Sequence, residues 1–139
     1  MKIFTKKLSF HMNEEVDIKD ITSEIENFIQ EKKLRNGFAV IFSVGSTAAI
    51  STMEYEPGLV KDIQRTLERI APSNIDYEHH KTWHDYNGKS HVRATLLGPS
   101  LVVPFIDCKL ITGTWQQIVL INLDTRARER EVVIQVIGE

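Results

Sequence analysis

Four of the five histidines in the chain lie within thirteen residues, in the segment H-H-K-T-W-H-D-Y-N-G-K-S-H. Imidazole is the commonest metal ligand in proteins, and it both donates and accepts protons near neutral pH. Helix and strand packing does not require such a density of rings. The segment therefore predicts a site for a metal ion or an anionic ligand. The four residues are His79, His80, His84 and His91.

The spacing favours one pair of these histidines. His79 and His91 flank a short polar segment, so we expect both rings to reach one point. His80 and His84 are the alternates. Catalytic zinc sites use three protein ligands and keep one position open, and Glu54 is the best carboxylate candidate for the third ligand. No H-x-x-x-H or C-x-x-C spacing sharpens this prediction, and each histidine taken alone is more simply explained as a surface or capping residue.

The same segment offers a second kind of site, for a phosphate or another anion. Ser90 is placed to cap a short helix over residues 91–97, whose free N–H groups would face the negative charge. Arg93 would add a positive charge, and Asn87 and Ser100 lie in the tight turns on either side. A plain helix cap with a surface arginine explains these residues equally well. The chain contains neither a nucleotide P-loop nor a G-x-G-x-x-G sequence.

Three further features carry weaker signals. Cys108 stands in an expected β-turn without a His or Asn at a recognisable spacing, so an incidental thiol is the simpler interpretation. Trp115 and the two glutamines after it fall on an expected apolar strand, where the tryptophan would be core and the glutamines would hydrogen-bond. The basic run over residues 126–130 predicts a solvated turn, with a phosphate contact as the alternative.

Composition places these residues in one globular domain over residues 1–139. Hydrophobic residues make up 42% of the chain and charged residues 26%. A net charge of −2 argues against a nucleic-acid binder. The lone Cys108 cannot form an internal disulfide, which favours a reducing, cytoplasmic location. No apolar stretch approaches the roughly 20 residues of a membrane span, and the first residues lack the apolar run of a signal peptide.

Periodicity predicts an α+β fold with a mostly antiparallel β-sheet and helices packed on one face. Alternating polar and apolar residues indicate strands, and apolar residues at helical spacing indicate helices. Strands are expected over residues 3–11, 38–44 and 101–137, helices over 18–33 and 57–71, and a polar loop over 79–89.

Several blocks together resemble the YjbQ-like family, whose members are often labelled secondary thiamine-phosphate synthase. The likeness covers nearly the whole chain, and the blocks are specific only in combination. They are Y-x-H from Tyr77, N-G-x-x-H from Asn87, A-T-L-L-G-P-S from Ala94, V-P from Val103 and G-T-W-Q-Q-I from Gly113.

The resemblance implies a compact α+β fold, a homotrimer, and a His-lined pocket near subunit boundaries that can hold a divalent metal, zinc or magnesium. It also implies a weak thiamine-phosphate synthase activity, which joins a pyrimidine pyrophosphate to a thiazole phosphate. His79 and His91 match the family's two downstream histidines, and Glu54 matches its acidic position. Block positions with less defined roles are Asn87, Arg93, Ser100 and Trp115.

One departure from the family bears on the metal. Many relatives carry a His-Thr pair where this chain has Gly45 and Ser46. If that histidine is a ligand, the site here keeps two histidines and Glu54, recruits His80 or His84, or binds no metal.

Three hypotheses follow for function. The first is an enzyme acting on phosphorylated small molecules, with His79 and His91 holding a metal or serving as acid and base, and Arg93 holding a phosphate. In it, Asn87, Ser90 and Ser100 would contact the ligand. The second is a non-catalytic homotrimer that binds a metabolite or a metal. The third gives the histidines only capping roles. The expected partner is a small phosphorylated metabolite, with no nucleic acid and no membrane.

Overall fold

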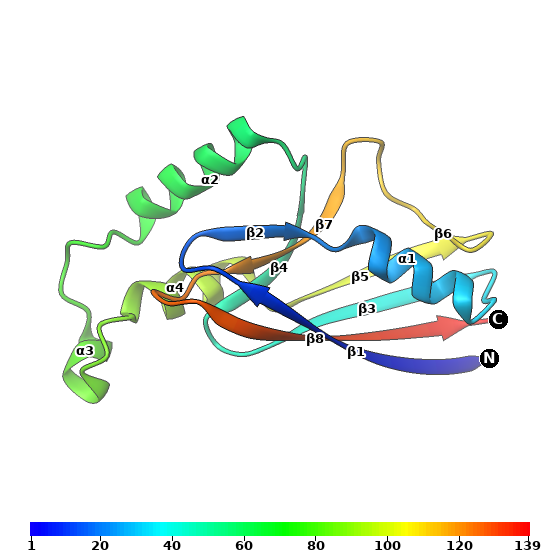
Figure 1. Cartoon of the computed structure of the whole chain (residues 1–139), viewed down its shortest axis with the longest axis horizontal. Helices are drawn as coiled ribbons and strands as arrows, with labels where there is room; N and C mark the ends of the chain where they lie inside the picture. Colours follow the sequence, from blue (N-terminus) through cyan, green and yellow to red (C-terminus); the bar gives the residue numbers. More distant parts are fainter.

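The computed structural model describes residues 1–139, which form eight strands and four helices (Figure 1). In chain order they are β1 (Lys2–Met12), β2 (Asp17–Asp20), α1 (Thr22–Glu31), β3 (Gly37–Val44), β4 (Ala48–Met53), α2 (Pro57–Ile70), α3 (Glu78–Trp83), α4 (Gly88–Leu97), β5 (Ser100–Ile106), β6 (Lys109–Leu110), β7 (Gln117–Asn122) and β8 (Arg128–Gly138). The expected α+β class is confirmed. None of the helices is both long and apolar enough for a membrane crossing.

The strands divide into two antiparallel sheets. The larger has the order β1-β8-β3-β5-β6 and the smaller has the order β2-β7-β4. The inner face of the larger sheet packs against α1 and against one face of the smaller sheet, in an apolar cluster that includes Ile25, Ile134 and Leu120. The helices α2 and α4 pack on the opposite face of the smaller sheet. Helices α1, α2 and α4 therefore lie on one side of the larger sheet, as the sequence predicts.

Strand β7 explains how one domain contains two apolar layers. Ile118 and Leu120 belong to the cluster between the sheets, whereas Val119 and Ile121 belong to the cluster beneath α2 and α4. Successive side chains of a strand point to opposite faces. Because both faces of β7 are covered, its sequence reads as a continuous apolar run and not as an alternation.

The outer face of the larger sheet has no layer above it. Phe42 and Val44 on β3 are 42% and 46% exposed, and Val102 on β5 is 64% exposed. A shallow depression between β3 and β8 is lined by Val40, Phe42, Val44, Val133 and Gln135. A contiguous apolar face of this kind marks an interaction surface in soluble proteins.

Residues 17–20 form strand β2, so the helix expected over residues 18–33 begins later, at Thr22. Asp20 ends β2 and stabilises the start of α1. Its Oδ1 accepts hydrogen bonds from Thr22 N at 3.0 Å and from Thr22 Oγ1 at 2.6 Å. Ile18 is buried, but as part of a strand that pairs with Ile121 of β7. The few apolar residues at the start of this segment fit a helical period as well as a strand period. Only the pairing with β7 makes residues 17–20 a strand.

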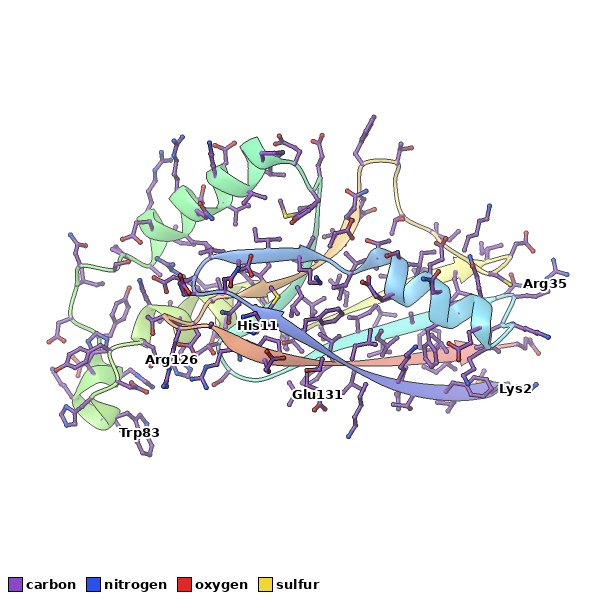
Figure 2. The ribbon with its side chains drawn as sticks, viewed as in Figure 1. Lys2, His11, Arg35, Trp83, Arg126 and Glu131 are labelled. Atoms are coloured by element: carbon purple, nitrogen blue, oxygen red, sulfur yellow. The ribbon has the colours of Figure 1, made fainter.

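Two other expectations are corrected. The segment expected as a polar loop contains the short helix α3, and α4 begins at Gly88, so Ser90 lies inside the helix and does not cap it. Trp115 does not belong to an apolar strand. It lies in the loop before β7 and is 72% exposed, since no element packs over that loop. Figure 2 shows a second exposed indole, Trp83 of α3, at the end of the molecule opposite Arg35.

Candidate functional site

His79 and His91 lie side by side where α3 meets α4, with their ring centroids 4.5 Å apart and their planes tilted by 38°. Helix α3 presents His79 from its first turn, and α4 presents His91 from its first turn. The structure thus brings together the two rings that the sequence pairs. Two imidazoles at this separation can share a proton, an anion or a metal ion between them.

A carboxylate stands behind this pair. Asp85 Oδ1 lies 3.4 Å from His79 Nδ1, within ion-pair range, although Nδ1 is buried and its geometry does not make a hydrogen bond. With its amide nitrogen facing Asp85, Asn87 donates to both carboxylate oxygens, at 2.9 Å and 3.2 Å. Asn87 therefore positions Asp85 beside His79, a role different from the direct ligand contact expected for it.

His91 is set up to be a neutral imidazole. Burial lowers its pKa below the ordinary histidine value, and the neighbouring His79 lowers the pKa further. The carboxylates of Asp85 and Asp124 and the backbone of Ser46 act in the opposite direction without reversing the shift. A neutral ring at physiological pH can accept a proton or bind a metal, and both are the roles that catalysis asks of histidine.

A pocket of about 320 Å³ opens beside His91. The turn between β3 and β4 forms one wall and α4 forms the other. The floor and walls consist of small residues, so the imidazole is the largest polar group in the pocket. The lining is Gly45, Ser46, Ala48, His91, Ala94, Thr95 and Pro99.

Arg130 lies behind the turn that carries this pocket and is only 6% exposed. Its Nε donates to Asn122 Oδ1 at 3.0 Å, and its Nη2 donates to the same oxygen at 2.7 Å. Nη2 also donates to Thr47 O at 3.0 Å and to Thr47 Oγ1 at 2.6 Å. A Cβ atom at Gly45 would stand 3.0 Å from Arg130 Nη1, so the missing side chain leaves this nitrogen next to the pocket wall.

Asp124 completes the polar layer under the pocket. Its buried carboxylate accepts from Thr47 Oγ1 at 3.1 Å, from Arg128 Nε at 2.9 Å and from Thr125 N at 2.7 Å. Burial alone would raise the pKa of Asp124, but these donors together hold it below its ordinary value. Asp124 is therefore a fixed negative charge whose hydrogen-bonding capacity is already used.

In the sequence, Arg130 belongs to a basic run that predicts a solvated turn, with a phosphate contact as the alternative, and the burial of this arginine is not expected. A signal was nevertheless present. Arg130 has the same parity as Val132, Ile134 and Val136, which face the core along β8. Extending that alternation by one step towards the N-terminus would have turned the arginine inward.

Arg93 is not available to bind a phosphate. It is 2% exposed, and its Nε and Nη2 donate to Ala71 O at 3.1 Å and 2.8 Å, while Nη2 also donates to Glu68 Oε2 at 2.9 Å. The step of two residues from His91 to Arg93 amounts to about 200° around the helix axis, so the two side chains leave α4 on opposite sides. The guanidinium ties the end of α2 to α4.

Glu54 also lies away from the histidine pair. It follows the last residue of β4, whereas Ala48, the first residue of β4, lines the His91 pocket. Six strand residues at about 3.3 Å each separate the two ends by about 20 Å. Accordingly, no group of three His, Cys, Asp or Glu side chains within the chain is arranged to hold a metal ion.

The alternate histidines have other partners. His80 packs edge-on against Tyr77 with a centroid distance of 5.5 Å, and its Nδ1 lies 3.3 Å from Asp76 Oδ1. This ring helps to close the first turn of α3. His84 ends α3 in the left-handed conformation, with φ of 58°. His11 forms an exposed ion pair with Glu129 at 2.6 Å, far along the chain from the site, as expected for an edge residue.

Neither of the two serines expected to contact a ligand presents its hydroxyl to a ligand beside the histidine pair. Ser90 is fully buried in α4, and its hydroxyl has no hydrogen-bond partner. Ser100 begins β5 on the exposed face, opposite Phe42.

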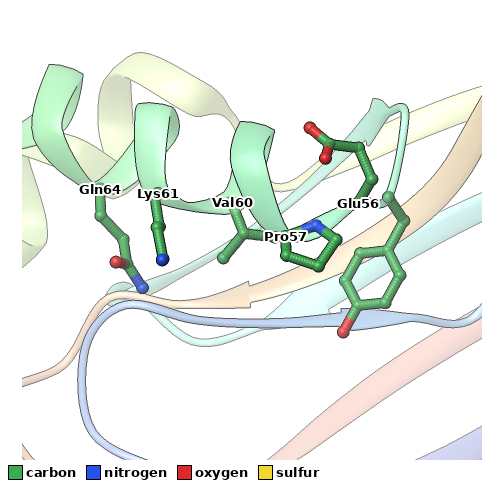
Figure 3. Close-up of a pocket in the computed structure, with 6 residues that line it drawn as sticks. Glu56, Pro57, Val60, Lys61 and Gln64 are labelled. Carbon is green, nitrogen blue, oxygen red and sulfur yellow. The ribbon is translucent and has the colours of Figure 1, made fainter.

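A second pocket, of about 390 Å³, lies at the start of α2 (Figure 3). Tyr55, Pro57 and Val60 contribute to its lining, with Lys61 and Gln64 at one end. Glu56 caps the helix by accepting from Gly58 N at 2.9 Å and from Leu59 N. Because the capping carboxylate already occupies the helix N-terminus, this pocket offers no free backbone donors to an anion, and the histidine pocket is the better candidate.

Comparison with known proteins agrees with this architecture. The chain is 37% identical to a UPF0047 protein of Methanothermobacter thermautotrophicus over 139 residues, which cover 100% of this chain and 95% of that protein. It is 30% identical to UPF0047 protein YugU of Bacillus subtilis, with coverage of 96% and 98%. A crystal structure of a YbjQ-like protein of unknown function from Sulfolobus solfataricus matches with a TM-score of 0.93 at 32% identity, covering 99% of each chain.

A further solved structure, of a hypothetical protein from Aeropyrum pernix, matches with a TM-score of 0.90 at 28% identity and covers 98% of this chain and 99% of that one. The family model described as UPF0047 protein YjbQ-like matches residues 6–139, which include every residue of the histidine pocket. By sequence and by fold, the chain belongs to the YjbQ-like UPF0047 family.

Proposed function

We propose that this protein is an enzyme acting on phosphorylated small molecules, with His79 and His91 as its acid–base pair. The observation that carries the proposal is the contact between these rings, 4.5 Å apart, in which one ring has a lowered pKa and the other is backed by Asp85. Titratable groups whose environments differ in this way are typical of acid–base sites.

The reaction that fits this pair best is displacement of pyrophosphate, as in a thiamine-phosphate synthase. The ring nitrogen of a thiazole phosphate forms a C–N bond with the methylene carbon of a pyrimidine pyrophosphate, and the C–O bond to pyrophosphate breaks. The histidine pair, carrying one proton, donates that proton to the departing pyrophosphate oxygen. Stabilising the leaving group in this way lowers the barrier where negative charge develops.

The test is pyrophosphate release from such a substrate pair, measured for the wild type, His79→Ala and His91→Ala. We expect each variant to lose on the order of 100-fold or more in kcat/KM, which is the usual contribution of a positioned acid or base. His11→Ala is the matched control, because His11 is an exposed histidine that does not line the pocket. Turnover that survives in the double variant would contradict the acid–base assignment.

A non-catalytic role in metabolite binding is the second candidate. The pocket lining favours it, since His91 is the one titratable side chain there among small residues. In that case phosphorylated ligands bind saturably to the wild type, and no pyrophosphate is released under any condition. Calorimetry alongside the release assay separates the two candidates.

A divalent metal, zinc or magnesium, is a further proposal for the same pair. The two imidazoles supply two ligands, and no third His, Cys, Asp or Glu side chain of the chain is arranged with them to hold a metal ion. The ligand or a neighbouring copy of the chain would have to complete the site. We expect Zn²⁺ titration to show binding that weakens at least tenfold in His79→Ala and is unchanged in His11→Ala; equal binding by all three proteins would remove the metal.

We also propose that the protein is a homotrimer. The support is the uncovered apolar face of the larger sheet, where Phe42 and Val102 are exposed, and the number three comes from the family resemblance. Light scattering should give a trimer, and Phe42→Lys should shift it towards smaller species, whereas Lys61→Glu on α2 should not. A wild-type monomer at micromolar concentration contradicts the proposal. The lone Cys108 supports a reducing, cytoplasmic location for this assembly.

A further inference from the structure

We propose that Arg130, which lies behind the pocket wall at Gly45, forms with Ser46 a phosphate subsite next to His91. This inference rests on the proposed function and deepens it, because it names the residues that hold the phosphate of the substrate. The ligand class is a small phosphomonoester or a pyrophosphate.

The first argument is charge. The hydrogen-bond partners of Arg130 are the neutral groups of Asn122 and Thr47. The nearest buried carboxylate, Asp124, is engaged by Arg128, Thr47 and Thr125. Arg130 is thus a buried cation without a directly bonded anion, and burying a charge without such a partner is costly. A phosphate in the adjacent pocket would supply the missing negative charge.

The second argument is geometry. The bonds of Nε and Nη2 hold the guanidinium plane in place, which leaves Nη1 as the free corner of the fork. Gly45 has φ of +142°, and a Cβ there would stand 3.0 Å from Nη1. Any larger side chain at this position would therefore cover the guanidinium. With glycine, Nη1 can reach a ligand in the 320 Å³ pocket that Gly45, Ser46 and His91 line.

The third argument is that the neighbouring cations already have partners. Lys89 is nearly buried, and its Nζ contacts Glu15 Oε1 and lies 2.7 Å from Ser73 Oγ. Arg93 is paired with Glu68 and with the end of α2. Among these buried positive charges, Arg130 is the one that lies behind the pocket wall at Gly45 and has no carboxylate bonded to it.

Calorimetric titration of the full-length protein with inorganic phosphate, and separately with pyrophosphate, tests the subsite. We expect saturable binding to the wild type that weakens at least tenfold in Arg130→Lys, because lysine keeps the charge but loses the forked donors. Gly45→Ala should weaken binding to a similar degree by covering Nη1. Circular dichroism and thermal unfolding establish that each variant is folded.

Gly98→Ala is the matched control for Gly45→Ala. Gly98 also has a positive φ, of +91°, but a Cβ there meets nothing within 4 Å. Both substitutions strain the backbone, so only a block of Arg130 distinguishes them. We expect Gly98→Ala to lose stability while keeping its phosphate affinity within about threefold of wild type; an equal loss in both variants overturns the assignment.

The outcome is separable from that of the acid–base proposal. His79→Ala should lose on the order of 100-fold or more in kcat/KM. It should keep phosphate affinity within about threefold, because His79 does not line the pocket. If the wild type binds neither anion, or if Arg130→Lys and Gly45→Ala both bind as tightly as wild type, the subsite is wrong even where turnover remains histidine-dependent. Where Arg130→Lys does not fold, Gly45→Ala decides alone.

Discussion

Arg93 of α4 and Arg130 of β8 are both buried, but they differ in the charge of the groups to which they bond. Arg93 is 2% exposed and is ion-paired with Glu68 at 2.9 Å. Arg130 is 6% exposed and bonds only to neutral oxygens, those of Asn122 and Thr47. Burial alone therefore does not distinguish a structural cation from a ligand-binding one. The charge of the partners and the space in front of the guanidinium distinguish them.

The histidines of α3 repeat this contrast on a smaller scale. His80 packs against Tyr77 and helps to close the helix, whereas its neighbour His79 faces the ring of His91. Adjacent helix positions point about 100° apart, so one side chain is used for packing and the other is left for chemistry. Both residues are histidines, and the direction in which each side chain leaves the helix decides whether it packs or faces His91.

The largest effect is expected for Arg93→Met, which tests the structural half of the comparison. The variant removes hydrogen bonds to Ala71 O and the ion pair with Glu68. Breaking a buried pair costs roughly 3–5 kcal/mol, and because Glu68 is half exposed we expect about 2–3 kcal/mol. Urea unfolding measures the loss, with the exposed Arg69→Met as control. A folded Arg93→Met protein that loses phosphate affinity would reverse the two roles.

Asn122→Asp should give Arg130 a carboxylate partner, as Arg93 has in Glu68. A carboxylate at position 122 would bond directly to Arg130 and neutralise it, so phosphate affinity should fall at least tenfold. The substitution also removes the donor to Asn13 O, now at 2.7 Å, which should cost roughly 1–2 kcal/mol of stability. Calorimetry and urea unfolding measure the two effects separately. Undiminished phosphate binding by the folded variant would contradict the charge argument.

The histidine pair makes a smaller, spectroscopic prediction. Titration followed by NMR should place the pKa of His91 below the ordinary value of about 6.5. His79→Ala should raise that pKa, because the neighbouring ring is one of the groups that lowers it. Since a lowered histidine pKa means that the folded state binds fewer protons, His91 destabilises the fold as pH falls below 6.5. A pKa that falls further in His79→Ala would show that the rings do not couple as described.

The smallest effect concerns Glu68. Hydrogen bonds from the backbone and side chain of Ser73, with a further contribution from Arg93, lower its pKa to about 2. Its stabilising contribution is therefore present above about pH 4.5 and is lost as pH falls towards 2. Glu68→Gln should be less stable than wild type at neutral pH by under about 1 kcal/mol, since the group is half exposed. The two unfolding curves should converge at low pH; a constant gap would contradict this origin.

Local sequence determined much of the fold and one part of the candidate site. The apolar spacing after Pro57 predicted α2 to within a residue, and the strand expected up to residue 137 corresponds at its end to β8. The turn at Asp107 and Cys108 was also expected, and both residues have positive φ. His79 and His91 could be paired because only a short segment joins them, so their meeting depended little on the rest of the chain.

Tertiary structure alone decided the rest, because the deciding contacts join residues distant in sequence. Residues 17–20 became a strand only by pairing with β7, about a hundred residues later. Arg93 was drawn away from the pocket by the end of α2, and Glu54 was carried to the far end of β4. The placement of Arg130 behind Gly45 required β8 to pair with β3, with Val44 opposite Glu131. Propensity and periodicity act over a few residues, whereas the position of a charge relative to a pocket depends on how whole layers pack.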